Sequence, residues 1–236
     1  MGTRGPVPKG KSVLWSADFA YATGLMVADG SLSSNGRHLS FVSKEIEQIE
    51  NFKKCLGLSV KIGTIYSKNL KLTEPYYRVQ WGNVVLYRFF LSIGLTPNKS
   101  LTQGPLQIPK QYFMDFLRGL YDGDGCFYSY FDPRWENSFM FYLSFASGSN
   151  DFIAWLQLEI QEATGLVGHR TKAKNQRYFQ LKYAKQETLK LLKQLYEKPG
   201  APHLKRKKLK IVRALRIVGL ALPGSARKSV KHEPGC

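Results

Sequence analysis

The chain has 236 residues, of which 43% are hydrophobic and 22% are charged, so it can bury one large core or two smaller ones. Thirty-five Lys and Arg residues stand against 17 Asp and Glu residues, and the formal net charge of +18 favours a polyanionic partner, nucleic acid above all. No run approaches the roughly twenty apolar residues of a membrane span, and the start lacks the apolar core of a secretory signal. We therefore expect an intracellular protein, in the cytoplasm, the nucleoid or an organelle matrix, that has no membrane partner and is not secreted.

In chain order, the sequence predicts a loose arm, two similar folded halves and a basic helix. The predicted segments are a basic arm (1–12), an N-terminal half (13–94), a linker (95–110), a C-terminal half (111–202), a basic helix (203–221) and a loose tail (222–236). Pro and Gly without periodicity mark the linker, and turn-forming residues mark both ends of the chain. The charged side of the basic helix predicts either a solvated surface or contacts with phosphates.

The two halves repeat one order of elements. The strand-like run LSFVS at 39–43 recurs as LSFAS at 143–147, and an amphipathic segment follows each copy. A second pair, at 77–95 and 179–197, is predicted to be strand and then helix in both halves. A turn-rich insertion in the second half falls at DPRWEN (132–137). The fold class is therefore predicted as α+β, with two pseudo-symmetric αββαββα halves and antiparallel sheets.

Each half contains an apolar helical run that ends in an aspartate and a glycine, YATGLMVADGSL (21–32) and FLRGLYDGDGCF (116–127). Ser16 is predicted to cap the first helix, and the glycine after each aspartate is predicted to end its helix in a left-handed conformation. Because positions i and i+4 share one side of a helix, small residues at that spacing predict that the two helices pack closely together. These small residues are Gly24 and Ala28 in the first helix and Gly119 and Gly123 in the second.

Packing of this kind places Asp29 and Asp124 side by side at the same end of the helix pair. An acid in the last helical turn is disfavoured by about 0.3 to 1 kcal/mol, because the helix dipole is negative there, and the two like charges repel each other. A compensating cation is therefore expected, and two carboxylates with the carbonyl oxygens of Ala28 and Gly123 suit Mg²⁺. Such a metal equips a protein for phosphodiester hydrolysis. Paired acids could also serve a glycosidase, but the charge of +18 gives no reason to prefer a neutral sugar polymer.

The three cysteines do not form a second chemical site. Cys55, Cys126 and Cys236 are odd in number and contain no C-x-x-C pair, so neither a disulfide framework nor a zinc site is predicted. No G-x-x-x-x-G-K-[ST] phosphate loop occurs either, which disfavours a nucleotide-driven enzyme.

The two helical runs resemble a known motif. Residues 22–30 (ATGLMVADG) and 117–125 (LRGLYDGDG) look like two copies of the motif of the LAGLIDADG homing endonucleases, in the single-chain form with two motifs. The second copy matches closely. The first keeps the Asp-Gly pair that carries the chemistry but departs at four positions: Ala22 for Leu, Thr23 for Ala, Met26 for Ile and Val27 for the earlier Asp. With the repeated flanks, the resemblance covers residues 14–220.

The resemblance implies a monomeric, pseudo-dimeric saddle that holds double-stranded DNA on its antiparallel sheets, with the motif helices as the central interface. Asp29 and Asp124 would bind the divalent metal, Mg²⁺ with Mn²⁺ as a substitute, whereas Ca²⁺ would support binding without cleavage. The implied activity is an intron-encoded type of endonuclease. It would cut both strands across the minor groove at a long, asymmetric target and leave short 3′ overhangs.

Basic residues are expected to assist the cut. Lys44 follows the LSFVS strand and resembles the active-site lysine of the family, although a solvated residue at a helix start would also explain it. Gly148 occupies the equivalent position in the second half, so Lys182 on the last strand is the expected second basic residue.

Polar strand residues are expected to contact bases and phosphates, because Arg can bind guanine and Gln can bind adenine through two hydrogen bonds. They are Arg37, Ser40, Arg78 and Gln80 in the first half, and Arg134, Arg170, Lys172, Arg177 and Gln180 in the second. A shift of one residue in strand register would invert which of them point into the groove.

Other functions fit the same scaffold. An intron RNA maturase or a DNA-binding regulator that does not cleave would keep the binding surfaces and lose the chemistry. Both aspartates are intact, which favours the enzyme. A general RNA-binding protein is disfavoured, because no aromatic RNA-binding strand motif and no KH loop are present.

Overall fold

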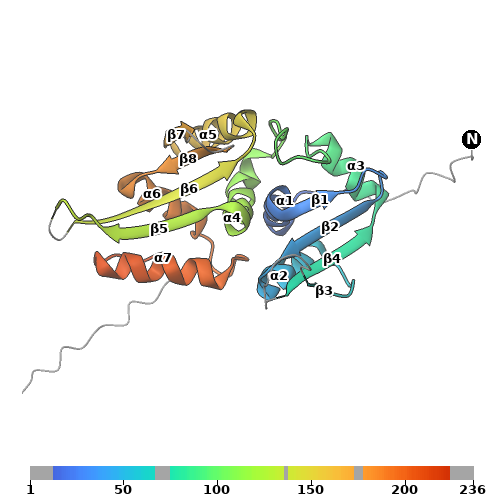
Figure 1. Cartoon of the computed structure of the whole chain (residues 1–236), viewed down its shortest axis with the longest axis horizontal. Coiled ribbons are helices and arrows are strands. Elements are labelled where there is room, and N and C mark those ends of the chain that lie inside the picture. Colours follow the sequence, from blue (N-terminus) through green and yellow to red (C-terminus); the bar gives the residue numbers. More distant parts are fainter. Residues whose placement is uncertain (1–12, 67–74, 136–137, 173–177, 224–236) are drawn as a thin grey trace, which may run out of the picture.

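A computed structural model of the chain describes residues 13–66, 75–135, 138–172 and 178–223 (Figure 1). The predicted arm and nearly all of the predicted tail lie outside the described residues, as does Arg177. Within the described ranges, none of the helices has both the length and the apolar character that crossing a membrane requires.

Within the described residues, each half has three helices and four strands in the same order, which confirms the predicted αββαββα halves. The first half consists of α1 (Ala17–Asp29), β1 (Gly30–Leu32), β2 (His38–Ser43), α2 (Ile46–Leu56), β3 (Gly63–Ile65), β4 (Tyr76–Gly82) and α3 (Val84–Ser92). The second consists of α4 (Phe113–Asp124), β5 (Cys126–Phe131), β6 (Phe139–Ser147), α5 (Asn150–Thr164), β7 (His169–Lys172), β8 (Phe179–Tyr183) and α6 (Lys185–Leu195). A short 3-10 helix, η1 (Lys110–Tyr112), precedes α4, and α7 (Lys205–Ile217) follows the second half.

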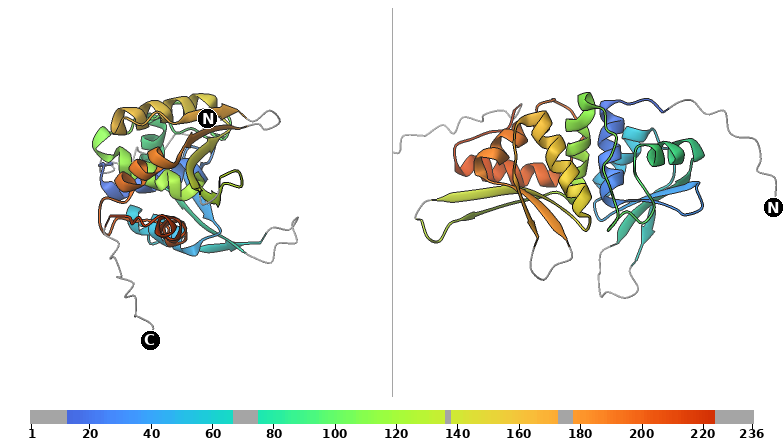
Figure 2. Two further views of the ribbon diagram at one scale, coloured as in Figure 1. Left: turned by 90° about the vertical axis from the view of Figure 1, so that its left-hand side faces the viewer. Right: turned by 90° about the horizontal axis from the view of Figure 1, so that it is seen from above.

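The described strands form two four-stranded antiparallel sheets of the same topology, β1-β2-β4-β3 and β5-β6-β8-β7. The register repeats as well, because Leu39 pairs with Trp81 in the first sheet and Leu143 pairs with Tyr183 in the second. Figure 2 shows both sheets on the same side of the helices, next to each other along the long axis of the molecule. The faces that the helices do not cover, here called the open faces, therefore point to one side of the protein.

Alternating side chains separate the helix-covered face of each sheet from its open face. In β2, Leu39 and Phe41 are buried, whereas Ser40 between them is only partly buried. The helices supply the other side of each core, as Phe41 shows by stacking on Phe52 of α2 with the ring centroids 4.3 Å apart. This period of two explains why LSFVS and LSFAS predicted the strands correctly.

The helices that end in Asp-Gly, α1 and α4, pack against each other at the centre of the molecule (Figure 1). A methyl group on Gly24 would lie 2.1 Å from the carbonyl oxygen of Phe116, and one on Gly119 would lie 2.0 Å from that of Tyr21. A Cβ atom cannot come this close to backbone, so only glycine fits at both positions. The predicted packing along small residues is thereby confirmed.

The start of α1 agrees with its prediction, but the ends of both helices do not. Ser16 Oγ accepts a hydrogen bond from Phe19 N at 3.1 Å, which confirms the N-cap. The predicted left-handed ends are wrong, because Gly30 has φ −83° and Gly125 has φ −68°, and the chain continues directly into a strand. Glycine is needed for space instead, since a methyl group on Gly125 would lie 2.4 Å from the side chain of Tyr121. Each aspartate therefore lies at a junction of helix and sheet.

Candidate active site

Asp29 and Asp124 are the last residues of α1 and α4, and the packing of the helices brings these ends together. A methyl group on Gly123 would lie 2.2 Å from Ala28 Cβ and 3.4 Å from Asp29 Oδ2, so the Asp29 carboxylate reaches the last turn of α4. Both aspartates are open to solvent on one side, yet the surrounding protein removes much of their water. This burial, followed by the charge of Asp124, raises the pKa of Asp29 to about 6, and burial also raises the pKa of Asp124.

Two lysines lie against the ends of these helices, one at each helix. Lys99, in the linker, donates hydrogen bonds to the carbonyl oxygens of Ala28 at 3.1 Å and Gly30 at 2.6 Å. Lys207, in α7, donates to three carbonyl oxygens at the end of α4, those of Tyr121 (2.6 Å), Gly123 (2.9 Å) and Gly125 (2.7 Å). The same device thus closes both helices.

The lysines and the aspartates influence one another. Burial lowers the pKa of Lys207 to about 8 and also lowers that of Lys99, while the negative charges of the two aspartates oppose this shift. In turn, the charges of Lys207 and Lys99 lower the pKa of Asp29 and so favour its ionised form. Cations near a helix C-terminus also offset the negative end of the dipole. The chain itself therefore supplies part of the compensating positive charge that the sequence predicts.

The predicted metal ligands fall into two groups. The carbonyl oxygens of Ala28 and Gly123 accept hydrogen bonds from Lys99 and Lys207. The carboxylates of Asp29 and Asp124, in contrast, accept no hydrogen bond from the residues that the structure describes. Only the carboxylates are therefore available to a cation without a change in the surrounding hydrogen bonds.

Lys44 and Lys182, the basic residues that the sequence favours for the cut, each lie over a tyrosine ring. Lys44 Nζ is 5.2 Å from the ring centroid of Tyr76, and Lys182 Nζ is 4.1 Å from that of Tyr142. Sequence reasoning misses Lys99 and Lys207 because they come from the linker and the basic helix, which carry many other charges. The repeat could have found them, since each follows the third helix of its own half.

The earlier acid of the second motif, Asp122, has a structural position. Its side chain is buried, and its Oδ2 accepts hydrogen bonds from Tyr21 Oη and Leu204 N, both at 2.8 Å. Gln48 Nε2 donates to the backbone oxygen of Asp122 at 3.0 Å. Burial raises the pKa of this carboxyl to about 6. Asp122 therefore joins α1, α4 and the segment before α7, whereas its counterpart Val27 is simply a buried apolar residue.

The residues of the first sheet that are predicted to contact DNA share its open face. Ser40 pairs with Gln80 in the register of β2 and β4, and Arg78 lies two residues before Gln80 on the same face. Arg37 is exposed, and its Nε lies 3.4 Å from the position of a methyl group on Gly82, at the end of β4. The first half therefore groups its four predicted residues on one side.

The second half distributes its predicted residues over both faces of the sheet. Gln180 lies on the open face, because its neighbour Leu181 is buried beneath the helices. Arg170 pairs with Leu181 and Lys172 pairs with Phe179, so both basic residues lie on the opposite face from Gln180. All four residues of β7 are exposed, so no alternation in hydrophobicity indicates its register.

Arg134, the next predicted contact, lies in the hairpin between β5 and β6. Its guanidinium forms an ion pair with Asp132, with Nη2 and Oδ2 2.8 Å apart, and a second hydrogen bond joins Nε to Oδ1 at 3.0 Å. The Arg134 guanidinium also lowers the pKa of Asp132. The hairpin therefore presents a partly neutralised arginine at its tip.

An aromatic cluster covers part of the open face of the second sheet, and sequence reasoning misses it. The rings of Tyr128 and Tyr142 stack with centroids 5.1 Å apart, and those of Tyr130 and Tyr142 stack at 6.2 Å. Lys182 Nζ lies over both Tyr128 and Tyr142, at 5.1 and 4.1 Å from the centroids. The alternation of these tyrosines with buried phenylalanines such as Phe127 could have revealed the cluster.

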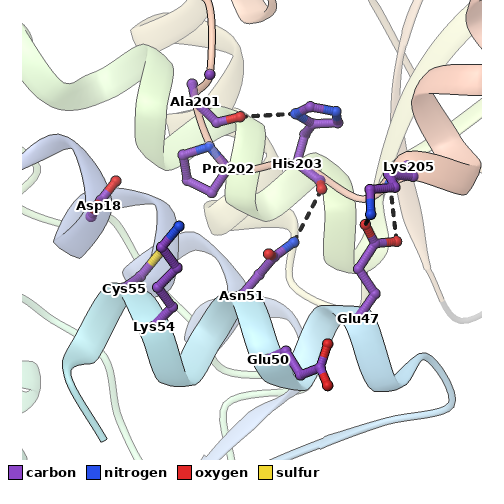
Figure 3. Close-up of a pocket in the computed structure, with 11 residues that line it drawn as sticks. Asp18, Glu47, Glu50, Asn51, Lys54, Cys55, Ala201, Pro202, His203 and Lys205 are labelled. Carbon is purple, nitrogen blue, oxygen red and sulfur yellow. Dashed lines mark hydrogen bonds and ion pairs between the residues drawn. The ribbon is translucent and has the colours of Figure 1, made fainter.

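Two pockets lie near the junction of the halves. One, of about 390 Å³, is bordered by Asp124 and by residues of α1, α4 and the start of α5. The other, of about 310 Å³, lies where α2 meets the segment before α7 (Figure 3). There Asn51 Nδ2 donates to the His203 carbonyl oxygen at 3.1 Å, and Lys205 Nζ pairs with Glu47 at 3.4 Å (Figure 3). The second pocket therefore lies at a contact between the halves, and of the two only the first borders an aspartate of the pair, Asp124.

At the level of sequence, no family model and no curated protein matches the chain. Solved structures match its fold at low identity. A mesophilic variant of the homing endonuclease I-DmoI has a TM-score of 0.53 and 12% identity, and the match covers 83% of this chain and 97% of that chain. The LAGLIDADG meganuclease I-AabMI bound to uncleaved DNA has a TM-score of 0.55 and 12% identity, covering 80% of this chain and 87% of that chain.

A further similar structure does not carry the name of a nuclease. Full-length DUF199/WhiA from Thermatoga maritima has a TM-score of 0.52 and 17% identity, with 90% of this chain covered. The match spans 62% of that chain, less than two thirds of its length. Together, these likenesses show that the chain has the two-motif LAGLIDADG fold, and this scaffold is shared by homing endonucleases and by DUF199/WhiA.

Proposed function

We propose that the protein is a site-specific double-strand DNA endonuclease that uses a divalent metal to hydrolyse phosphodiester bonds at a long, asymmetric target, leaving short 3′ overhangs. The observation that carries the proposal is the pairing of Asp29 and Asp124 where the halves meet, with Lys99 and Lys207 on the ends of the same two helices. Two related sets of acid and base suit two cuts, one in each strand of a duplex.

The chemistry of the carboxylate pair fits Mg²⁺, with Mn²⁺ as a substitute. Asp29 and Asp124 would hold the metal, because their carboxylates share one partly desolvated space and accept no hydrogen bond from the described residues. A bound metal of this kind supplies an activated water and offsets the charge on the leaving oxygen. The structurally similar endonuclease I-DmoI has been solved in complex with DNA and Mn. Ala28 and Gly123 would act as further ligands only after their carbonyl oxygens release Lys99 and Lys207.

The two lysines would hold the helix ends in place and present positive charge beside the phosphate that is cut. Lys207, whose pKa is lowered to about 8, is close enough to neutral pH to exchange a proton during the reaction. Lys44 and Lys182 would contact DNA from their places over tyrosine rings.

The open faces would hold the duplex. In the first half the proposed contacts are Arg37, Ser40, Arg78 and Gln80, and in the second half they are Arg134 and Gln180. The two open faces differ in side chains, so an asymmetric target follows from the proposal. The likeness to I-AabMI, which has been solved on DNA, supports this placement of the duplex.

A second candidate is a DNA-binding regulator, or an intron RNA maturase, on the same scaffold. One observation favours it, because lysine ammonium groups already occupy the carbonyl oxygens of Ala28 and Gly123. The likeness to DUF199/WhiA also shows that the fold is not restricted to proteins named as nucleases. In this case the lysines would serve as permanent counterions of the aspartates.

Incubation of the purified protein with a randomised duplex library separates the two candidates. With Mg²⁺ or Mn²⁺ we expect cleaved ends with short 3′ overhangs, and with Ca²⁺ we expect enrichment of bound duplexes without cleavage. Asp29→Asn and Asp124→Asn should each lower the cleavage rate at least about 100-fold, because the metal contributes several kcal/mol. Both variants should still bind the duplex.

The control is Asp151→Asn, which removes an exposed acid from the first turn of α5 and should leave cleavage unchanged. Binding without cleavage under every metal would replace the proposed function with the second candidate. Normal cleavage by either variant of the pair would refute the site assignment.

A further inference from the structure

Helix α7 is strongly basic and has two distinct sides. In the 13 residues of Lys205–Ile217 it contains seven basic residues and no acidic residue. Its apolar side, with Ile211, Ala214 and Leu215 buried, packs the helix beside β5, an edge strand of the second sheet. The apolar side therefore explains why the helix docks, but it does not explain the charge.

The first four basic residues of α7 have partners within the protein. Lys205 pairs with Glu47, and Arg206 pairs with Glu45. Lys207 binds the end of α4, and Lys208 Nζ lies 5.4 Å from the ring centroid of Tyr196. The positive charges of these four residues are therefore accounted for by contacts within the protein. The contacts also hold the start of α7 against α2, α4 and Tyr196.

The remaining three, Lys210, Arg213 and Arg216, are exposed, and their side chains form no ion pair or hydrogen bond with the described residues. We call them the basic stripe. They are spaced three residues apart, so adjacent members are neighbours on one side of the helix and repel each other. A helix C-terminus favours Arg216 through the dipole, but Lys210 lies too far from that end to benefit. Three like charges without a partner are typical of a surface that meets an anion.

The position of α7 indicates which anion the basic stripe binds. The helix runs beside β5 on the outer margin of the second half (Figure 1), and it is seen end-on when the molecule is viewed along its long axis (Figure 2). It is therefore nearly parallel to the line along which the two sheets are placed. A duplex that contacts both open faces follows the same line. The first half has no helix at the corresponding place among the described residues, because the linker follows α3 there.

We propose that the basic stripe binds backbone phosphates of double-stranded DNA along the outer margin of the second half, and this rests on the proposed binding of a duplex. The stripe spans about 9 Å along the helix. Phosphates of one strand follow one another about every 3.4 Å along the duplex axis, so up to three of them match this length. The contact does not distinguish between bases, and it strengthens DNA binding at one end of the target more than at the other.

The test compares two variants that lose the same charge. In one, Lys210, Arg213 and Arg216 are changed to Gln. In the control, three exposed basic residues of the helical layer are changed to Gln: Arg88 of α3 and Lys190 and Lys193 of α6. Fluorescence anisotropy with a mixed-sequence 30-base-pair duplex gives the dissociation constant at a series of NaCl concentrations without metal. Circular dichroism checks that α7 remains helical.

The slope of log affinity against log salt should become shallower by about 2 to 3 in the stripe variant, since each lost phosphate contact contributes about 0.9. In the control it should change by less than 1. Arg213→Gln alone should change the slope by about 1, which keeps the test valid if the triple variant unfolds. On a cleavage target selected from the library, ethylation interference should also show phosphates along the outer margin of the second half whose modification weakens binding by the unmodified protein but not by the stripe variant.

Equal slopes for the stripe variant and the control, with tight binding by the unmodified protein, would overturn the inference and leave the proposed function intact. Failure of the unmodified protein to bind any duplex would overturn the proposed function and this inference with it.

Discussion

The two halves of the molecule are most alike where they meet and most different where their open faces begin. At the centre, each half contributes an aspartate at a helix end and a lysine that closes that end. On the open faces, Ser40 pairs with Gln80 in the first half, whereas the equivalent pair in the second half is Ser144 and Lys182, and Lys182 lies over stacked tyrosines. Close packing and shared charge constrain the centre, whereas each open face can vary without affecting the other half.

The largest effect should come from the shared centre. Gly24→Ala and Gly119→Ala would each place a methyl group 2.0 to 2.1 Å from a carbonyl oxygen of the other helix. We expect each change to lower the free energy of unfolding by about 2 to 3 kcal/mol, because the backbones must move apart. Urea denaturation measures the loss.

Gly104→Ala in the linker is the matched control, since a methyl group there has no neighbour within 4 Å. It should change the free energy of unfolding by no more than about 0.5 kcal/mol. If one of the two helix glycines tolerated alanine as well as Gly104 does, the centre would not be symmetric in packing.

The next effect tests whether the two lysines are equivalent. Lys207→Gln should slow cleavage about tenfold, and Lys99→Gln should slow it less, because Lys207 binds three carbonyl oxygens and Lys99 binds two. Burial lowers the pKa of Lys207 to about 8, so the unmodified protein loses this charge as the pH rises above 8. The difference between Lys207→Gln and the unmodified protein should therefore shrink above pH 8.

Rates of nicking of each strand in a supercoiled plasmid, measured from pH 6.5 to 9, provide this comparison. Lys190→Gln on α6 is the control and should leave both rates unchanged. A larger effect of Lys99→Gln, or a difference that grows with pH, would contradict the assignment.

A smaller effect concerns the stability cost of the carboxylate pair. The pKa of Asp29 in the folded state is raised from 3.8 to about 6, so protonation favours the folded form. Its contribution to stability is fully present below about pH 4 and is lost as the pH rises through 6. The Asn side chain of Asp29→Asn does not titrate. Relative to this variant, the free energy of unfolding of the unmodified protein should fall by about 1 kcal/mol between pH 4 and 7, a value that is reduced because one side of the carboxylate is exposed to solvent.

Urea denaturation in metal-free buffer at pH 4, 5, 6 and 7 measures this difference. Asp151→Asn is again the control and should follow the unmodified protein. A constant difference between Asp29→Asn and the unmodified protein over this range would show that the pair is fully solvated.

The smallest effect compares single residues on the two sheets. Arg78→Gln removes a basic residue from the open face of β4 and should weaken duplex binding about fivefold, near the low end for one lost contact. Arg170→Gln removes one from the opposite face of β7 and should weaken binding less than twofold. Anisotropy at fixed salt measures both, and equal losses would contradict the assignment of Arg170 to the helix-covered face.

The order of the helices and strands could be predicted because the same pattern of elements occurs in both halves of the sequence. The strand runs at 39–43 and 143–147 alternate apolar and small residues. Burial alternates along 39–43, whereas Leu143, Ser144 and Phe145 are all buried in the second run. The glycines of the motif helices predicted the packing, because only a close approach of two backbones explains them at that spacing. The register of β7 could not be predicted, since a strand of four exposed residues carries no hydrophobic pattern.

The site could be predicted only where it is local to the motifs. Asp29 and Asp124 follow from the helix ends, but their lysines come from segments that fold back over a long stretch of chain. Gly148 occupies the position that is equivalent to Lys44. The linker explains why no side chain is found there, because a methyl group on Gly148 would lie 2.6 Å from the carbonyl oxygen of Ser100. Long-range packing of this kind leaves no periodic trace in the sequence.

Each lysine closes the motif helix of its own half, and this has a consequence for how the chain is assembled. Lys99 lies in the linker directly after the half that contains Asp29, and Lys207 lies in α7 after the half that contains Asp124, so each lysine follows the half whose helix it closes. What each half lacks is the second carboxylate, and the glycine contact between α1 and α4 provides it. Two copies of one half, each with the segment that follows it, joined about a twofold axis through that contact, would build the same centre as a homodimer. The linker makes this association intramolecular, so the pair of carboxylates forms at any protein concentration.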